Sequence, residues 1–360
     1  MRLRFLVALA GLGPAFSTPA FSQSQDDAVA MVTGALHGYI QPAYQAFATA
    51  ADELHKQIGT LCQDPSAKTL EAARAGFDEA VQAWAGIELV HFGPVTQDNR
   101  LERIFFWPDR RSIGLKQVQG ILATEDASAT SLDTLVQKSV AVQGFGALEF
   151  SLFGTGSENL AEQAGFRCDY SRTVAANLDE IAGKLSAGWN DGEGIARLWT
   201  EPGPDNPLYR SGEESLSDLI DIAIHGLELV RDVRINGFLA ELSDEDQPKQ
   251  ALFWRSWQTI PAIRSNLRSI GGLLDAARIE EHLPEDNSWI AGSIRFELAN
   301  ADRALAALGD EPIADILADP ERRAKLDYVR IVTSGLSDLI GRQLSGEFGL
   351  TAGFSSLDGD

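Results

Sequence analysis

The feature that most constrains the fold of this chain is an apolar pattern with three-and-four spacing, which recurs along nearly all of its 360 residues. Side chains three and four positions apart lie on one face of an α-helix, and alternating patterns long enough for strands are absent. We therefore predict an all-α fold. The expected helices cover residues 27–61, 67–91, 108–122, 132–153, 171–189, 213–240, 246–278, 286–308 and 318–345.

A proline-rich segment divides the helical pattern into two parts. Residues 201–207 contain three prolines and one glycine, and a helix cannot continue through such a composition. We place a linker at 201–212, between an N-terminal helical bundle over 23–200 and a C-terminal bundle over 213–349. Residues 350–360 have no helical pattern and are expected to form an irregular tail.

The N-terminus has the pattern of a secretory signal peptide over residues 1–22. Two arginines precede a short apolar run, and a small-x-small sequence suited to cleavage ends at Ser22. An amphipathic first helix is the alternative, but Gly13 and Pro14 would interrupt it. We expect an exported, periplasmic bacterial protein whose mature chain has no transmembrane segment.

The chain is strongly acidic, with a net charge of −22. A surface of this sign repels nucleic acid and anionic lipid, so neither is an expected partner. It would attract a cation or a basic partner only weakly, because most of the carboxylates are expected on solvated helix faces.

The sequence contains two cysteines, Cys62 and Cys168. Disulfides form in exported proteins, and a bond between these two would close a long loop. In the chain-entropy description it would stabilise the fold by about 4 kcal/mol. We predict the bond; two buried free thiols are the alternative.

The carboxylate of Glu149 is the first candidate for a functional group. Its neighbours on the same helix face are all apolar: Val142, Phe145, Leu152 and Phe153. A carboxylate in such a setting needs a charged partner, a proton or a metal ion. A purely structural pair with an arginine is the alternative to a role in a site. We expect Arg100 or Arg103 to be the partner, rather than His91 or His225.

Two further pairs have the spacing of side chains that meet on one helical turn. Glu88 and His91 form E-x-x-H, and His225 and Glu228 form H-x-x-E. This spacing lets two side chains of a bundle helix reach one metal ion. The alternative is chance spacing for the first pair and a solvated polar face for the second. The face of the second pair also carries Asp218, Asp221 and Asp232.

The segment 98–111 has four arginines and an aromatic run. Arg100 or Arg103 could neutralise a buried glutamate through paired hydrogen bonds. Trp107 and Asp109 are candidates for the lining of a cleft, and a packed loop held by ion pairs is the alternative. The sequence has no signature of a zinc protease, a thiol redox protein, a serine hydrolase or a phosphate-binding loop.

Several segments together resemble the imelysin-like family, in particular its exported members. Residues 144–149 read G-x-G-x-x-E, which is similar to the family motif G-x-H-x-x-E with Gly146 in place of the histidine. Gly144 and Glu149 match the motif. The matching segments are 84–95, 99–109, 143–154, 204–209 and 353–360.

The resemblance implies two bundle-like helical halves with a cleft between them, in a protein linked to the uptake of iron or other metals. Some members of the family are described as metallopeptidases. In the family the motif histidine and glutamate are regarded as a metal or catalytic site. The absence of an imidazole at Gly146 therefore argues against peptidase activity.

Three functions remain open at this point. The first is a non-catalytic binding or accessory protein in iron or metal uptake, whose partners are a cation or uptake components. The second is a metal-dependent peptidase whose histidine comes from another helix, and the third is an interaction module with an inactive site. A divalent metal or iron is the candidate cofactor, with Glu149, His225 and Glu228 as ligands. A contact between Glu149 and an arginine, without a histidine nearby, would favour the third function.

Overall fold

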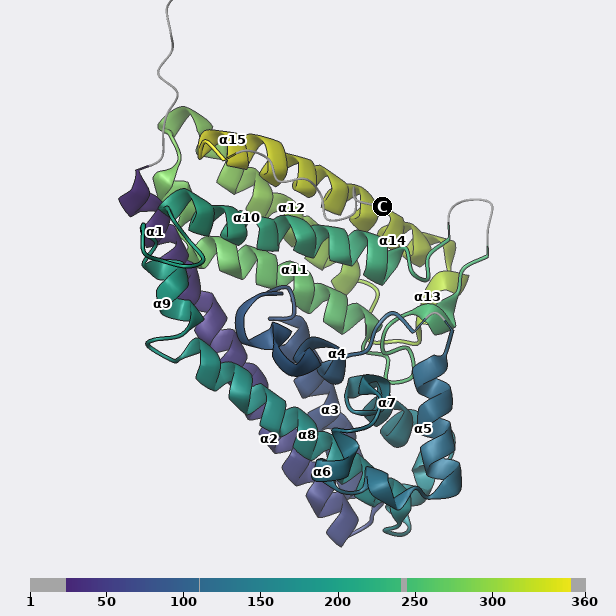
Figure 1. Ribbon diagram of the computed structural model, residues 1–360. Coiled ribbons are helices and arrows are strands. Elements are labelled where there is room, and N and C mark those ends of the chain that lie inside the picture. The colour runs from purple at the N-terminus through teal and green to yellow at the C-terminus, as the bar shows by residue number, and fades with distance from the viewer. Residues whose placement is uncertain (1–23, 110, 241–244, 351–360) are drawn as a thin grey trace, which may run out of the picture.

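Helices make up the regular structure of the chain, seen here in a computed structural model (Figure 1). The structure describes residues 24–109, 111–240 and 245–350, and no strand occurs within these ranges. The predicted all-α fold is therefore confirmed. The principal helices are α1 (Gln25–Ala35), α2 (Gln41–Gln63), α3 (Ala67–Ala85), α7 (Phe145–Phe153), α8 (Phe166–Trp189), α10 (Gly212–Glu228), α11 (Thr259–Ala276), α12 (Trp289–Ala306) and α14 (Pro320–Asp338).

Shorter helices connect or extend these elements. The α-helical ones are α4 (Arg100–Ile104), α5 (Ile113–Thr124), α6 (Leu132–Leu135), α9 (Ile195–Thr200), α13 (Ile313–Ala318) and α15 (Ser345–Glu347). Three π-helical segments continue longer helices: Leu36–Ile40, Leu229–Ile235 and Leu339–Leu344. Short 3₁₀ segments are Gly93–Asn99, which has a kink at Gln97 and Asp98, and Ala127–Ala129, Val140–Val142, Ser157–Ala161, Pro248–Gln250, Ile279–His282 and Glu285–Asn287.

The helices pack in two groups that share one apolar core. In the N-terminal part α2 packs against α3 and α8, and in the C-terminal part α10, α11, α12 and α14 form a bundle (Figure 1). α1 packs on α10 and α3 packs on α11, so that buried apolar side chains continue from one group to the other. An irregular segment joins α9 to α10 over 201–211. The division into domains at 201–212 stays a prediction.

Side-chain caps determine where several helices begin. Ser24 and Ser66 accept hydrogen bonds from backbone N–H groups in the first turns of α1 and α3. Asp319 does the same for α14, where Pro320 at the first position has no N–H that would need a partner. None of the helices in the described ranges is long and apolar enough to cross a membrane.

Three expected helices are shorter than the pattern predicts. α3 ends at Ala85 and not at residue 91, α5 begins at Ile113 and not at 108, and the helix continuing α10 ends at Ile235 and not at 240. The apolar pattern extends beyond these ends because turns also bury apolar side chains, as for Ile87 and Val90. Apolar spacing alone therefore does not locate these ends.

Two expected helices are interrupted by close backbone contacts or turns. The range 132–153 is divided between α6 and α7, because Gly144 lies against the backbone of Ile104. A Cβ on Gly144 would stand 2.1 Å from the carbonyl oxygen of Ile104. The range 246–278 becomes helical only at Thr259, since residues 251–258 form turns. The helices expected elsewhere are present, with ends that differ by a few residues.

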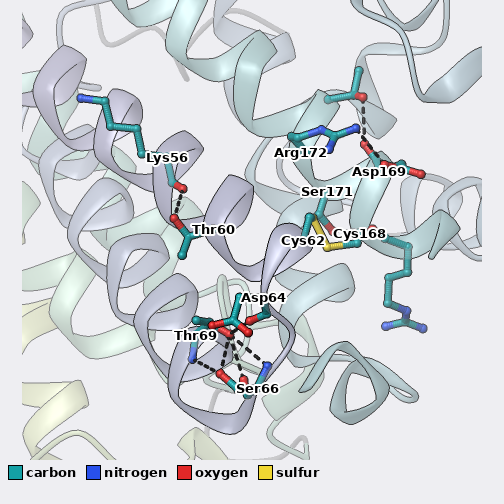
Figure 2. Close-up of a disulfide and its surroundings, with 12 residues drawn as sticks. Lys56, Thr60, Cys62, Asp64, Ser66, Thr69, Cys168, Asp169, Ser171 and Arg172 are labelled. Atoms are coloured by element: carbon teal, nitrogen blue, oxygen red, sulfur yellow. Dashed lines mark hydrogen bonds and ion pairs between the residues drawn. A yellow bond between two sulfur atoms is a disulfide. The ribbon is translucent and has the colours of Figure 1, made fainter. Parts of the chain in front are cut away.

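A disulfide joins the end of α2 to the start of α8 (Figure 2). The Cα atoms of Cys62 and Cys168 lie 5.6 Å apart, across a sequence separation of 106 residues. Packing of α2 along α8 brings the two cysteines together, and the predicted bond is confirmed. The predicted signal peptide over 1–22 and the tail beyond Leu350 lie outside the described residues.

Candidate functional site

Glu149 lies on α7 and is 5% exposed. Its Oε1 atom accepts hydrogen bonds from the backbone N–H groups of Arg255 (2.9 Å) and Ser256 (3.2 Å), and from the Ser256 hydroxyl (3.2 Å). Its Oε2 atom lies 3.7 Å from the Arg255 guanidinium. Burial raises the pKa of Glu149, and Arg255 together with the hydrogen-bond donors acts in the opposite direction.

The turn over residues 251–258 presents these donors because several contacts hold its backbone in place. The Thr259 hydroxyl donates to the carbonyl of Leu252 (2.6 Å), and the Phe253 ring stacks on Phe105 with centroids 4.4 Å apart. Phe253 and Trp257 have φ angles of +51° and +62°. Such angles are costly for bulky residues and are typical of functional segments.

The expectation that Arg100 or Arg103 pairs with Glu149 is wrong. Arg100 donates to the carbonyl of Pro94 and forms an ion pair with Asp98, so its partners are residues close to it in the sequence. Arg103 donates to the side chains of Gln143 and Asn177. The sequence does not show in which direction a side chain points, and neither arginine has a hydrogen bond or ion pair with Glu149.

Arg255 was missed because it lies inside the range expected to be helical, 246–278. On a regular helix its backbone N–H would have been used within the helix and could not have reached Glu149. The segment 253–257 has three aromatic residues around an arginine and a serine, and this cluster was the available signal. A cluster of this kind is more typical of a packed turn than of a bundle helix.

A pocket of about 260 Å³ opens beside Glu149. Trp107 and Asp109, predicted as lining residues of a cleft, do line it, together with Arg255 and Lys249. Its other lining residues are Pro108, Ser112, Leu115, Val233, Gly237, Gln247, Gln250 and Trp254. Residues from both sides of the segment 201–212 therefore form one pocket.

The pocket lining has two acidic groups, Asp109 and Glu149, and two basic ones, Lys249 and Arg255, and the acidic pair is the more fully engaged within the protein. Both oxygens of Asp109 accept backbone N–H bonds, from Ile113 (2.7 Å) and Leu115 (3.2 Å), and this carboxylate caps the start of α5. Lys249 forms no ion pair with the described residues, and its Nζ lies 6.0 Å from the centre of the Trp254 ring. The guanidinium of Arg255 lies 4.2 Å from the centre of that ring.

The two motif glycines have opposite surroundings. Gly144 is confined by the backbone of residues 103–104, as described above. At Gly146, where the family motif has histidine, no atom of another element lies within 4 Å of the position that a Cβ would take. We expected a side chain from another helix to fill this space, and that expectation is wrong.

Glu88 and His91 do not lie on one helical turn, since both follow the end of α3. The carboxylate of Glu88 is 2.8 Å from the Arg234 guanidinium and accepts a hydrogen bond from Asn266, also at 2.8 Å. His91 is exposed. The helical E-x-x-H interpretation is therefore wrong, and Glu88 belongs to a buried ion pair.

His225 and Glu228 lie on α10, and neither lines the pocket of Glu149. Glu228 is 7% exposed, and its Oε2 atom has no hydrogen-bond partner in the described part of the chain. Burial raises the pKa of Asp218 and of Asp221 on the same helix. The stripe is thus more buried than a solvated face would be.

The described residues do not provide a metal site. No group of three histidine, cysteine, aspartate or glutamate side chains within them has the arrangement to hold a metal ion. Glu149, His225 and Glu228 in particular are not brought together as one ligand set. The Oε1 atom of Glu149 is bound by N–H and hydroxyl groups and its Oε2 atom faces Arg255, so Glu149 has no second acidic or imidazole ligand beside it with which to share a metal ion.

The chain has relatives of known sequence and structure. It is 23% identical to iron-regulated protein A of Synechococcus elongatus over 352 residues, which cover 93% of this chain and 92% of that protein. An imelysin-like protein from Psychrobacter arcticum has the same fold, with a TM-score of 0.76, 22% identity and coverage of 94% of this chain and 100% of that one. A protein from Parabacteroides distasonis, described as an iron-regulated protein A precursor, has a TM-score of 0.72, 16% identity and coverage of 90% and 96%.

The sequence profile of imelysin matches residues 40–338, which is most of the chain. The match includes both glycine positions of the motif, Glu149 and the pocket. It also agrees with the fold shared with the two solved structures. The chain belongs to the imelysin family.

Proposed function

We propose that this protein is an exported, non-catalytic binding or accessory protein in the uptake of iron or another metal, and that its ligand enters the pocket beside Glu149. The main support is the engagement of Glu149, whose oxygens face three hydrogen-bond donors and the Arg255 guanidinium. A carboxylate whose charge is compensated in this way is a weaker general base and a weaker metal ligand than a free one. Similarity to iron-regulated protein A supports the link to iron.

The chemistry of the pocket favours an anionic or aromatic ligand over a bare cation. The carboxylates of Asp109 and Glu149 are both satisfied within the protein. Lys249 and Arg255 supply positive charge, and the rings of Trp107 and Trp254 supply stacking surface. We infer that iron would enter this pocket as an anionic chelate, with the metal held by the chelator and not by the protein.

A fluorescence titration tests the proposal, because Trp107 and Trp254 line the pocket. The mature protein is titrated with ferric citrate, with a ferric catecholate and with Zn²⁺ alone. We expect saturable quenching by at least one chelate and none by Zn²⁺. Lys249→Glu should weaken that binding at least about tenfold, since it reverses the charge at the pocket. Lys56→Glu, on the exposed side of α2, is the matched control.

Two results would contradict the proposal. Binding of Zn²⁺ alone that survives in Lys249→Glu would indicate a metal site formed by the protein. Cleavage of peptides that stops on addition of a chelator, and that Glu149→Gln abolishes, would establish the peptidase alternative.

An interaction module with an inactive site is the second candidate. The contact between Glu149 and Arg255 favours it, because no histidine is among the described residues that line the pocket. The same titration separates the two candidates: an interaction module would bind neither chelate, and Lys249→Glu would have no effect.

A further inference from the structure

Four large apolar side chains are exposed together on α12 and α14. They are Trp289 (51%), Phe296 (61%), Tyr328 (39%) and Ile331 (71%), and we call the surface that they form the outer face. Other large apolar side chains exposed in the described chain are scattered: Phe106, Ile113, Leu208 and Trp257. Single exposed apolar residues are ordinary, whereas a group of them marks a surface that another molecule covers.

The four side chains lie on one side of a two-helix layer. Trp289 and Phe296 are seven positions apart on α12, and Tyr328 and Ile331 are three positions apart on α14, so each pair shares a helix face. α12 packs along α14, and it also contacts Leu339–Leu344 beyond the end of α14. α14 begins beside α13, which follows the end of α12, and runs back towards α15, so the two helices are antiparallel (Figure 1). Phe296 and Ile331 each lie near the middle of their helix.

The layer lies on the far side of the C-terminal bundle from the N-terminal helices (Figure 1). α12 and α14 pack inward on α11 and α10, whereas α1 and α3 approach those same two helices from the N-terminal part. No atom of another described element lies within 4 Å of the Cβ positions of Gly292 and Gly335, one on each helix. The rest of the described chain leaves the outer face open.

The charge of this layer differs from that of the whole chain. The protein has a net charge of −22, yet α12 and α14 together have six basic and five acidic residues, which leaves one net positive charge. The repulsion that keeps two copies of so acidic a protein apart is therefore weakest here.

The exposed charges at the margins of the layer are also complementary between its two helices. On α12 the exposed ones are Arg295 and Arg303, and on α14 they are Glu321 and Asp338. Arg295 already pairs with Glu280 (2.5 Å), and Asp338 lies 3.6 Å from Arg342, so Arg303 and Glu321 are the charges that the described chain leaves for a partner. The basic residues of α14 are mostly occupied within the chain, as Arg323 is by Asp246 at 2.8 Å. A surface that offers one basic group on one helix and one acidic group on the other, at the same end of the layer, can pair both groups with a copy of itself.

We propose that the outer face is the interface of a symmetric dimer, in which α12 of one copy lies against α14 of the other. A two-fold axis along the helices would place Phe296 of one copy on Ile331 of the other, and Arg303 near Glu321. Helices of 18 and 19 residues form a layer about 27 Å long and about 20 Å wide. That footprint is about two thirds of the roughly 800 Å² that each partner buries in a standard interface, so residues flanking the two helices would supply the rest.

An anionic membrane fits the outer face less well than a second copy of the protein does. Basic residues that bind such a surface gather on one side with few acids among them. Here Glu321 and Asp338 are exposed on the same layer as the two arginines, and the rest of the protein is strongly acidic.

The test is the molar mass of the mature protein in solution, measured by sedimentation and light scattering over a range of concentrations. We expect a dimer, and we expect Ile331→Lys and Phe296→Asp each to raise its dissociation constant at least about 100-fold, as for residues central to an interface. Leu208→Asp is the matched control, because Leu208 is 55% exposed on another part of the surface and should leave the dimer unchanged.

Cross-linking gives a second readout that does not depend on weakening the interface. Mild oxidation of Ile331→Cys should give a covalent dimer, and the same treatment of Leu208→Cys should not. A wild-type protein that is monomeric at about 100 μM would overturn the proposal, since a functional interface should be occupied there. So would a dimer that both outer-face variants retain, a dimer that forms only when residues 351–360 are removed, or a monomer that binds vesicles containing anionic lipid.

Discussion

The carboxylate of Glu88 lies 2.8 Å from the guanidinium of Arg234, and each of the two side chains is 5% exposed. Glu88 follows α3 in the N-terminal part of the chain, and Arg234 lies in the π-helical continuation of α10. Asn266 of α11 donates to the other oxygen of Glu88 and to the carbonyl of Ala85. The pair therefore joins the two parts of the chain through a buried polar contact.

Replacing only one partner of this ion pair should strongly destabilise the protein. Arg234→Met leaves Glu88 buried without a counter-charge, and we expect the free energy of unfolding in urea to fall by about 3–5 kcal/mol. Arg172→Ala breaks an exposed pair with Asp169 and should change it by less than about 1 kcal/mol. Replacing both partners, Glu88→Leu with Arg234→Met, should cost clearly less than Arg234→Met alone. A double variant as unstable as the single one would contradict this account.

The two motif glycines should respond differently to the same substitution. Gly144→Ala places a Cβ 2.1 Å from a backbone carbonyl oxygen, and we expect a loss of stability of about 2–4 kcal/mol. Gly146→Ala adds a methyl group to open space on a helix, so it should be neutral or stabilising by up to about 1 kcal/mol. Thermal unfolding of the two variants side by side is the measurement. Equal losses of stability in the two variants would show that position 144 does not require glycine because of the nearby backbone.

Asp78 should make the stability of the protein depend on pH. Burial raises the pKa of Asp78 to about 7, and the nearby Asp310 acts in the same direction. The folded protein thus holds a proton that the unfolded chain releases, so stability is highest below the ordinary aspartate pKa and falls as pH rises towards 7. Asp78→Asn should be more stable than the unmutated protein at pH 8, by about 2 kcal/mol after allowing for solvent screening of a half-buried group.

The comparison for Asp78 is made at two pH values. At about pH 4 the gain from Asp78→Asn should nearly vanish, because Asp78 is then protonated in the folded protein. Asp205→Asn, at an exposed position, should show no such change between the two pH values. The same gain in stability at both pH values would indicate that Asp78→Asn acts through hydrogen bonding and not through the titration of Asp78.

The disulfide should account for a large part of the stability. Cys62→Ser with Cys168→Ser opens a loop with a sequence separation of 106 residues, and we expect a loss of about 4–5 kcal/mol in urea unfolding. Thiol titration of the denatured, unreduced protein should find no free thiol. Two reactive thiols per chain would show that the bond does not form in the isolated protein.

The mature N-terminus should be Gln23. The pattern over residues 1–22 predicts cleavage after Ser22, and mass spectrometry of the protein recovered from a periplasmic extract measures it directly. Replacement of the two early arginines by glutamates should retain the full-length chain in the cytoplasm. Recovery of an intact chain that begins at Met1 from the periplasm would contradict the prediction.

The sequence alone was enough for the fold class and for the family. Three-and-four spacing is a local property of helices, so it identifies α2, α8, α12 and α14 without any knowledge of packing. The disulfide followed from the count of two cysteines in an expected exported chain. The family resemblance rested on segments spread along the chain, and the imelysin profile confirms it over 40–338.

The partner of Glu149 was decided only by tertiary structure. Local spacing indicated that this carboxylate is buried and needs a partner, but the direction from which a partner arrives depends on how distant segments pack. Residues 251–258 form turns and not a helix, so the backbone N–H groups of Arg255 and Ser256 are not used within a helix. Both are therefore free to donate to Glu149. Apolar side chains are buried equally well by a turn and by a helix face, so a pattern of apolar residues cannot distinguish the two. For the same reason the sequence could not indicate that packing of α10 and α11 brings Arg234 and Asn266 against the carboxylate of Glu88.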